Sequence, residues 1–294
     1  MIECVPNISE GRDPETIDAV ARAVDDTPGV RLLEVDPDWD TNRTVLTFVG
    51  EPDAVLQGAR RCVEAAVAHI DMRRHEGTHP RMGAADVVPF SPFPDGDLEL
   101  CSQLARRLAT ALPADLPGWF YGGDVLLADV RRGQFEGLDD KLRSTAPDFG
   151  PRRKHPSAGA VAIGARGVLI AYNVDLDSAD VRIARGIARR LREFGDPPGL
   201  PGVRALGWKS PSRSGTQVTT NLVDWPTTPP HALLAAVRDE AAARGVEVLG
   251  AELVGMIPLA AVFAAGETVA AGLANLALPP ACEHKILEIA LEKP

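Results

Sequence analysis

Cysteine is scarce and scattered in this sequence. Four cysteines stand far apart among 294 residues, and they form neither a CxxC pair nor a dense disulfide pattern. Such usage is typical of a protein that works in a reducing compartment. The first residues also lack the basic and apolar regions of a secretory signal peptide. We therefore expect a cytoplasmic protein.

A long uninterrupted hydrophobic run is missing as well. The most apolar stretch, residues 257–282, is rich in alanine and is broken by Gly266, Glu267, Pro279 and Pro280. A membrane-spanning helix needs about 20 consecutive apolar residues. We expect buried helices in this stretch and no membrane partner.

Positive charge is also in deficit. The chain has 31 lysines and arginines against 41 acidic residues, a formal net charge of −10 at pH 7. This balance opposes binding to nucleic acid, which needs a basic surface. Neither a Walker A motif nor a dinucleotide-binding glycine fingerprint is present, which argues against nucleotide chemistry. The remaining partners are small molecules.

What the chain does have is enough apolar sequence for two modest domains. Hydrophobic residues make up 45% of the chain, and strand-like and helix-like segments alternate throughout, which favours an α/β fold. A strand–helix unit that starts at residue 43 resembles another that starts at residue 166. We therefore predict two related subdomains, each a mixed β-sheet with packed helices. A Pro/Gly-rich loop at 147–159 places them at residues 1–164 and 165–294.

Residues 70–90 form the segment richest in chemistry. They contain two of the six histidines, three arginines and three acidic residues, with two glycines and two prolines that interrupt regular structure. The segment follows a helical pattern and precedes an apolar strand. Such a dense set of titratable groups on a loop is a candidate functional site.

This loop contains a His-Glu-Gly-Thr-His run at residues 75–79, which matches the zinc-binding HExxH pattern. That pattern requires a continuous helix, which Gly77 and Pro80 oppose. We favour the alternative that His79 is a general base or acid, because the pKa of histidine lies near neutrality. A solvated loop histidine is the plain alternative.

Two further clusters of charged residues each have a structural and a functional interpretation of about equal weight. The basic run at residues 152–155 is either a solvated loop tip or a site that captures a carboxylate or phosphate. Asp36, Asp38 and Asp40 follow a predicted strand. They are either plain turn residues or include one that orients an imidazole or stabilises a cationic substrate.

Matches in order along nearly the whole chain make the sequence resemble the formiminotransferase domain family. They lie at residues 3–12 (ECVPNISEGR), 41–45 (TNRTV), 47–50 (TFVG), 70–73 (IDMR), 79–84 (HPRMGA), 132–136 (RGQFE), 147–151 (PDFGP), 164–166 (GAR), 169–171 (LIA), 207–208 (GW), 217–218 (QV), 221–222 (NL) and 252–255 (ELVG). No segment resembles the cyclodeaminase domain that is fused to this family in animals.

The resemblance implies two α/β subdomains with a ligand channel between them, usually assembled as a homodimer. It implies transfer of a formimino group between N-formimino-L-glutamate and tetrahydrofolate in histidine breakdown, with tetrahydrofolate as co-substrate and no metal. On this basis His79 is the catalytic base and acid, and Asp36 orients it or stabilises a cationic intermediate. Arg43, Arg81 and Asn42 are the expected substrate-binding residues.

The folate-binding segment implied by the resemblance contains the basic run. Its ten residues are Phe149, Gly150, Pro151, Arg152, Arg153, Lys154, His155, Pro156, Ser157 and Ala158. Residues 37–40 and 209–214 depart from the family pattern, so the sequence leaves the acceptor open. Two other functions also stay open. One is a zinc-dependent hydrolase that uses the HEGTH run, and the other is a non-catalytic folate-binding protein.

Overall fold

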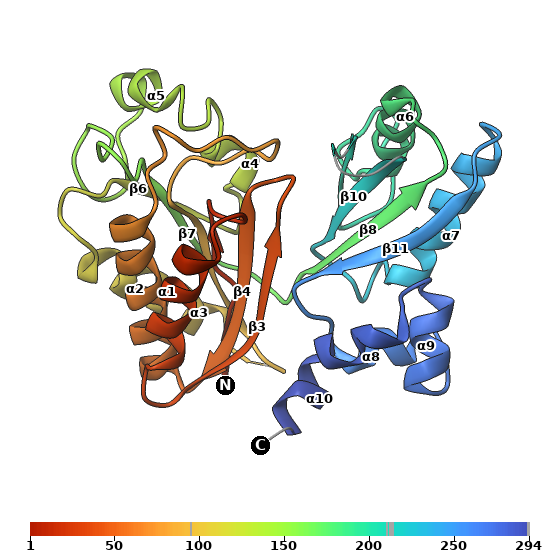
Figure 1. Cartoon of the computed structure of the whole chain (residues 1–294), viewed down its shortest axis with the longest axis horizontal. Helices are drawn as coiled ribbons and strands as arrows, with labels where there is room; N and C mark the ends of the chain where they lie inside the picture. The colour runs from red at the N-terminus through yellow and green to blue at the C-terminus, as the bar shows by residue number, and fades with distance from the viewer. Residues whose placement is uncertain (95, 210, 212–214, 293–294) are drawn as a thin grey trace. The chain divides into compact units, whose positions relative to one another are not determined.

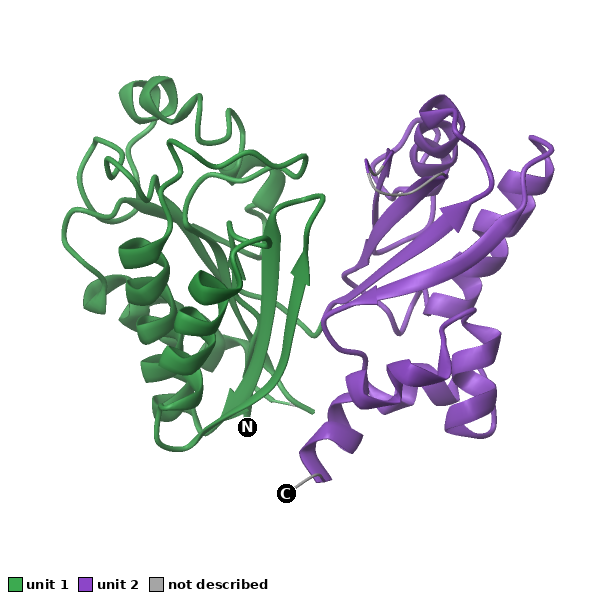
Figure 2. Cartoon of the chain, viewed as in Figure 1, with its two compact units in different colours: residues 1–168 green, residues 169–294 purple. Residues whose placement is uncertain are grey.

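The computed structural model describes residues 1–94, 96–209, 211 and 215–292. The chain divides into two compact units, Met1–Val168 and Leu169–Pro294, shown in separate colours in Figure 2. The sequence placed this boundary after residue 164. Each unit combines one β-sheet with helices, so the α/β fold with two subdomains is confirmed.

Unit 1 is built on a seven-stranded sheet. Its order is β3-β4-(β1, β2)-β5-β7-β6, and the pairings of β5 with β7 and of β7 with β6 are parallel. The strands are β1 (Ile2–Cys4), β2 (Asn7–Ile8), β3 (Val30–Asp38), β4 (Arg43–Gly50), β5 (Ala85–Pro92), β6 (Gly118–Tyr121) and β7 (Val161–Ala165).

The two shortest strands act as one interrupted strand in the middle of this sheet. β1 and β2 both lie between β4 and β5 and pair with each of them. The break falls at Val5 and Pro6, because proline has no N–H to donate to a neighbouring strand. Asn7 therefore lies in the sheet interior, opposite Val45 on one side and Val87 on the other.

Helices α1, α2 and α3 pack on one face of this sheet (Figure 1). Asp13 and Asp97 cap the first and third helices by accepting hydrogen bonds from backbone N–H groups. The apolar stripe of α2, which packs toward the core, includes the buried residues Val55, Cys62 and Val63. The helices of unit 1 are α1 (Pro14–Asp25), α2 (Pro52–His69), α3 (Leu98–Ala111), α4 (Leu127–Val130) and α5 (Leu138–Ser144).

Unit 2 has a four-stranded sheet in the order β11-β8-β10-β9, and every described pairing in it is antiparallel. Helices α6 and α7 bury their apolar side chains against one face. The elements are β8 (Ile170–Leu176), α6 (Val181–Leu191), β9 (Val203–Trp208), β10 (Thr216–Leu222), α7 (Pro230–Ala242), β11 (Val248–Val254), α8 (Leu259–Phe263), α9 (Val269–Asn275), the 3-10 helix η1 (Pro280–Lys285) and α10 (Leu287–Glu292).

The alanine-rich end of the chain forms short helices, as the sequence predicted. Among the described residues, no helix is both long and apolar enough to cross a membrane.

The predicted acidic turn at residues 36–40 needs correction. Asp36 and Asp38 belong to β3, and the turn spans residues 39–42. β3 continues because each residue from Glu34 through Asp38 has a partner on β4, where Asp38 lies opposite Arg43. Ladder pairing thus extends the strand beyond its apolar residues.

We predict that Gly83→Ala destabilises unit 1. A Cβ at this position would overlap the carbonyl oxygen of Ala160, which is backbone and cannot move aside easily. Such overpacking costs about 1–3 kcal/mol, so thermal denaturation should show a lower melting temperature. Gly167→Ala is the matched control, because nothing lies within 4 Å of a Cβ there. Equal melting temperatures for the two variants would contradict the prediction.

Candidate active site

The histidine-rich loop leaves α2 after His69 and returns to the sheet at Ala85. Backbone hydrogen bonds join it to two distant segments. Met72 N donates to Ser157 O at 2.8 Å, Ala84 N donates to Ala158 O at 2.9 Å, and Phe135 N donates to Arg81 O at 3.0 Å. The loop, residues 131–137 and the predicted folate-binding segment are thereby brought together within unit 1.

His79 lies in this loop with both ring nitrogens engaged. Its Nδ1 is 2.8 Å from the carbonyl oxygen of Pro80, to which it donates when protonated. Arg43 Nη1 lies against the ring, in close contact with Nδ1 and 3.2 Å from Nε2. A guanidinium can only donate, so the ring must present a lone pair to Arg43. This contact favours the neutral imidazole.

Burial is the main reason that the pKa of His79 is held well below its ordinary value of 6.5. The positive charges of Arg43 and Arg131 lower the pKa further, while the Pro80 carbonyl acts in the opposite direction. His79 is therefore neutral at pH 7 in the unliganded protein. Its single ring-nitrogen lone pair, which a general base needs, faces Arg43 in this structure.

A buried charge cluster surrounds His79. Asp86, whose side chain is 1% exposed, is 2.5 Å from Arg131 and 3.8 Å from Arg43. Its other oxygen accepts a 2.8 Å hydrogen bond from the Met82 backbone N–H. Burial and then the charge of Arg131 lower the pKa of Arg43 to about 9, so Arg43 stays protonated at neutral pH.

The sequence analysis did not identify three of the residues around this cluster. The sequence does contain an indication for Asp86, since a charged residue inside an apolar strand implies a buried partner. The sequence contains no such indication for Arg131, because it lies 45 residues from Asp86 along the chain. Asn7, whose side-chain oxygen accepts a 2.8 Å hydrogen bond from Arg43 Nε, was part of a matched motif without an assigned role.

A second group contains His75 and Arg81. His75 Nε2 is 2.7 Å from the backbone oxygen of Asn42, and its Nδ1 accepts a 3.2 Å hydrogen bond from Arg81 Nε. Arg81 also binds Glu136 through both terminal nitrogens, at 3.0 and 2.7 Å. Burial, and then Arg81, lower the pKa of His75, and the hydrogen bond from Arg81 lowers the pKa of Glu136.

These contacts do not match the zinc-binding pattern. The HEGTH run lies beyond the end of α2 and is not helical. Its two histidines therefore do not share a helical face, and the ring of His75 is used by Asn42 and Arg81. In the part of the chain that the structure describes, no group of three or more histidine, cysteine or acidic side chains is arranged to hold a metal ion.

Asn42 connects the turn after β3 to the loop. Its side-chain oxygen accepts a hydrogen bond from Gly11 N at 2.9 Å, and its side-chain nitrogen donates to Glu76 O at 3.0 Å. Its backbone adopts the left-handed conformation, with φ of 50°, which asparagine tolerates better than most residues. In this structure the amide positions the loop. The expected contact with substrate stays a prediction.

Asp36 lies in β3 opposite Val45, and Val45 lies opposite Asn7 on its other side. Paired residues in neighbouring antiparallel strands project on the same face. Asp36 thus shares a sheet face with Asn7 and with Arg43, two residues from Val45. The role of Asp36 toward His79 stays a prediction.

Local contacts occupy most of the basic run. Arg152 donates to the backbone oxygens of Leu142 and Arg143 at the end of α5, and Lys154 forms a 2.8 Å ion pair with Asp139. The Nδ1 atom of His155 accepts a hydrogen bond from Ala158 N at 2.9 Å. Of the four, only Arg153 has no hydrogen bond or ion pair to another described residue, and it is exposed.

Several matched motifs of unit 2 meet on the sheet face opposite α6 and α7. Gln217 accepts a 2.9 Å hydrogen bond from Trp208 Nε1 and donates at 3.0 Å to both Asp175 and Glu252. The segment 209–214 lies next to this network in sequence, and its residues 210 and 212–214 lie outside the described residues.

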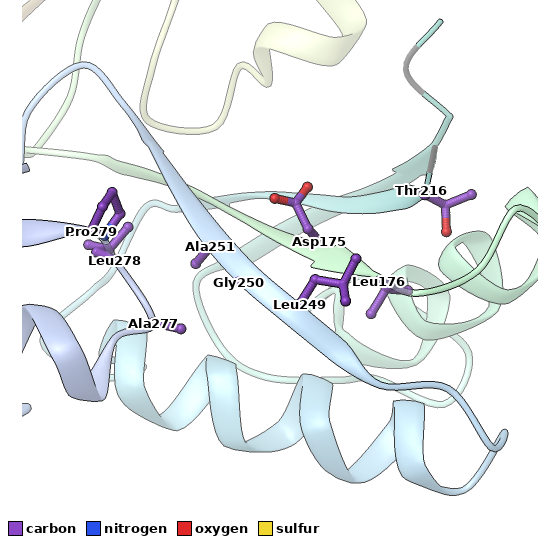
Figure 3. Close-up of a pocket in the computed structure, with 10 residues that line it drawn as sticks. Asp175, Leu176, Thr216, Leu249, Gly250, Ala251, Ala277, Leu278 and Pro279 are labelled. Atoms are coloured by element: carbon purple, nitrogen blue, oxygen red, sulfur yellow. The ribbon is translucent and has the colours of Figure 1, made fainter. Parts of the chain in front are cut away.

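Unit 2 also has a cavity of about 500 Å³. Its walls are mostly small and apolar, with Asp175 and Thr216 as polar members (Figure 3). None of the site residues predicted from the sequence lines it.

Comparison with known proteins identifies the family. Residues 1–166 match the family model described as "Formiminotransferase domain, N-terminal subdomain", and residues 171–290 match "Formiminotransferase domain". The chain therefore belongs to the formiminotransferase domain family, as its motifs implied.

Individual relatives agree with this assignment. The chain is 43% identical to "Formimidoyltransferase-cyclodeaminase" of Sus scrofa over 90% of its own length and 51% of that protein. It is 36% identical to "Glutamate formimidoyltransferase" of Streptococcus pyogenes serotype M1 over 91% of the chain and 92% of the relative. The protein of the same name from Thermoplasma acidophilum is 36% identical over 88% of each chain. The chain spans about half the length of the cyclodeaminase-containing relatives it matches.

We predict that Arg43→Gln raises the pKa of His79, because it removes one of the charges that oppose imidazole protonation. The imidazole resonances, assigned with a His79→Gln variant, should titrate well below pH 6.5 in the wild type and closer to 6.5 in Arg43→Gln. Arg61→Gln, an exposed change on α2, should leave the titration as in the wild type. An unchanged midpoint in Arg43→Gln would mean that burial alone sets the pKa.

Proposed function

We propose that the chain transfers a formimino group between N-formimino-L-glutamate and tetrahydrofolate, with His79 as general base and acid. The observation that carries the proposal is a largely buried histidine whose ring contacts Arg43, and whose pKa is lowered by burial, Arg43 and Arg131. It lies within a motif of the formiminotransferase domain family. Relatives that the chain matches over most of their length are named for this reaction.

The reaction needs one group that first accepts and then donates a proton. An amine nitrogen of tetrahydrofolate attacks the formimino carbon and forms a new C–N bond, and His79 accepts the proton lost from that nitrogen. The tetrahedral intermediate then collapses. The C–N bond to glutamate breaks, and the departing nitrogen receives the proton from His79.

Binding of an anionic donor prepares His79 for the second half of this cycle. A carboxylate bound to Arg43 offsets one of the charges that lower the pKa of His79. The pKa of His79 then moves back toward neutrality in the complex, where the imidazolium must act as an acid. Asp36 stabilises the cationic intermediate or orients His79.

Arg81 and Asn42 enter the proposal as positioning residues. Arg81 is held by Glu136 and His75, and Asn42 is held by Gly11 and Glu76. Both therefore fix the loop that carries His79. Arg43 is the member of the predicted substrate-binding set that lies against the catalytic ring.

The two other hypotheses lead to different outcomes in the same assay. A zinc hydrolase would lose activity with a chelator, and the non-helical HEGTH run does not support it. A non-catalytic folate-binding protein would bind tetrahydrofolate without turnover. From the family alone, we also propose a cytoplasmic homodimer, which sedimentation of the purified protein would test.

We predict that His79→Gln lowers kcat for formimino transfer by about 10²–10⁴-fold, the usual contribution of a general acid–base group. The assay follows formation of formimino-tetrahydrofolate in the presence of a chelator. His69→Gln, an exposed change at the end of α2, should keep wild-type kcat. Full activity in His79→Gln would remove His79 from the mechanism, and loss of wild-type activity with chelator would favour zinc.

The pH profile should separate the free and bound forms of His79. We predict that the acidic limb of kcat/KM, which reports the free enzyme, lies at lower pH than the acidic limb of kcat, which reports the substrate complex. The reason is that the donor carboxylate offsets the arginines only when it is bound. If the acidic limbs of kcat/KM and kcat lay at the same pH in the wild type, the bound carboxylate would not raise the pKa of His79.

We propose that Arg153 attracts the glutamate tail of folate. Arg153→Gln should raise KM for triglutamyl tetrahydrofolate by up to about fivefold, as expected for one exposed ion pair, and change KM for the monoglutamate less. Arg143→Gln removes an exposed charge that already pairs with Asp140, so it should not distinguish the two substrates. If Arg153→Gln and Arg143→Gln changed the two KM values equally, the glutamate tail of folate would bind elsewhere.

A further inference from the structure

The side chains around His79 carry more positive than negative charge. Arg43 and Arg131 face one carboxylate, Asp86, and His79 is neutral at pH 7. The Glu136 carboxylate is used by Arg81. The four side chains Arg43, Arg131, Asp86 and His79 therefore have a net charge of one positive unit, in a place where both arginines are nearly buried.

Arg131 has a donor that the protein does not use. Its side chain is 12% exposed, one terminal nitrogen binds Asp86, and its Nε atom is buried with no hydrogen-bond acceptor among the described residues. Burying a charged donor without an acceptor is unfavourable. An anion bound here would meet the second terminal nitrogen, for which no described residue is an acceptor, because Nε itself has no accessible surface. A planar guanidinium matches a carboxylate best.

The chemistry of the donor decides which carboxylate fits. In an N-formimino amino acid, the α-carboxylate is attached to the carbon that also bears the formimino nitrogen. A cation that binds this carboxylate must therefore lie within a few ångströms of the nitrogen that His79 protonates. Arg43 satisfies this, with Nη1 3.2 Å from His79 Nε2, and Arg131 shares Asp86 with it. The side-chain carboxylate of glutamate lies several bonds farther from that nitrogen.

We propose that Arg131, together with Arg43, binds the α-carboxylate of the formimino donor and restricts the enzyme to N-formimino derivatives of α-amino acids. This inference rests on the proposed formimino transfer. Asp86 is then a positioning residue. It holds both guanidinium groups close together yet neutralises only one of them.

The test compares two donors that differ only in the α-carboxylate. These are N-formimino-L-glutamate and N-formimino-4-aminobutyrate, which keeps the side-chain carboxylate. Wild type should prefer the first in kcat/KM by about 10- to 150-fold, the value of one hydrogen bond to a charged group. Arg131→Met should lose most of this preference, because it slows the first donor far more than the second. Arg131→Lys, which keeps the charge but not the planar fork, should retain part of it.

The neighbouring arginine provides the control. Arg132 is exposed and pairs with Asp129, so Arg132→Met should retain the wild-type preference between the two donors. Thermal denaturation of each variant confirms that it is folded. A wild-type preference that persists in folded Arg131→Met, or equal use of both donors by the wild type, would overturn the inference.

A binding measurement separates this inference from the proposed function. N-formyl-L-glutamate and 4-formamidobutyrate are unreactive analogues of the two donors, and calorimetry can measure their affinities without turnover. Tighter binding of the first to wild type, lost in Arg131→Met, would support the carboxylate site even if no formimino transfer were observed. Equal affinities for wild type would overturn it, even if transfer were observed.

Discussion

The candidate active site depends on a single buried carboxylate. Asp86 lies in the central strand β5 with 1% of its side chain exposed, and it holds Arg131 directly and Arg43 at longer range. Two guanidinium groups placed this close without it would repel each other inside a medium that screens charge poorly. The same carboxylate accepts a hydrogen bond from Met82 at the end of the histidine loop. The electrostatics of His79 and the path of its loop thus have a common origin.

Backbone and amide contacts carry the remaining geometry. The loop is bound to residues 157–158 and 135 through main-chain hydrogen bonds, and to the turn after β3 through Asn42. Main-chain contacts depend little on side-chain identity, so they position the loop whatever residues occupy its exposed positions. What sets this loop apart from an ordinary surface loop is the set of charged and ring-bearing side chains near His79.

The sequence contained much of the fold and part of the site. Alternating strand-like and helix-like segments predicted the α/β fold, and a helical pattern before residue 70 indicated α2, because periodicity directly reports a buried face. The density of titratable groups at residues 70–90 singled out the loop that the structure joins to residues 135 and 157–158. The pairing of Arg131 with Asp86 could not be predicted, because it depends on strand order and not on spacing. The partners of the basic run, Asp139 and Asp115, could likewise not be predicted, since folding brings them close.

The interrupted strand β1–β2 has a consequence for biosynthesis. Residues 2–8 occupy the middle of the unit 1 sheet, between β4 and β5, and β5 in turn needs its parallel neighbour β7. A ribosome that has released only the first two helices has therefore produced β1 and β2 with one partner, β4, but without the other, β5. Pairings of such long sequence separation form slowly. The sheet that holds Asn7, Arg43 and Asp86 can be completed only after residue 165 has emerged, so unit 1 must fold as a nearly complete chain segment and not strand by strand during translation.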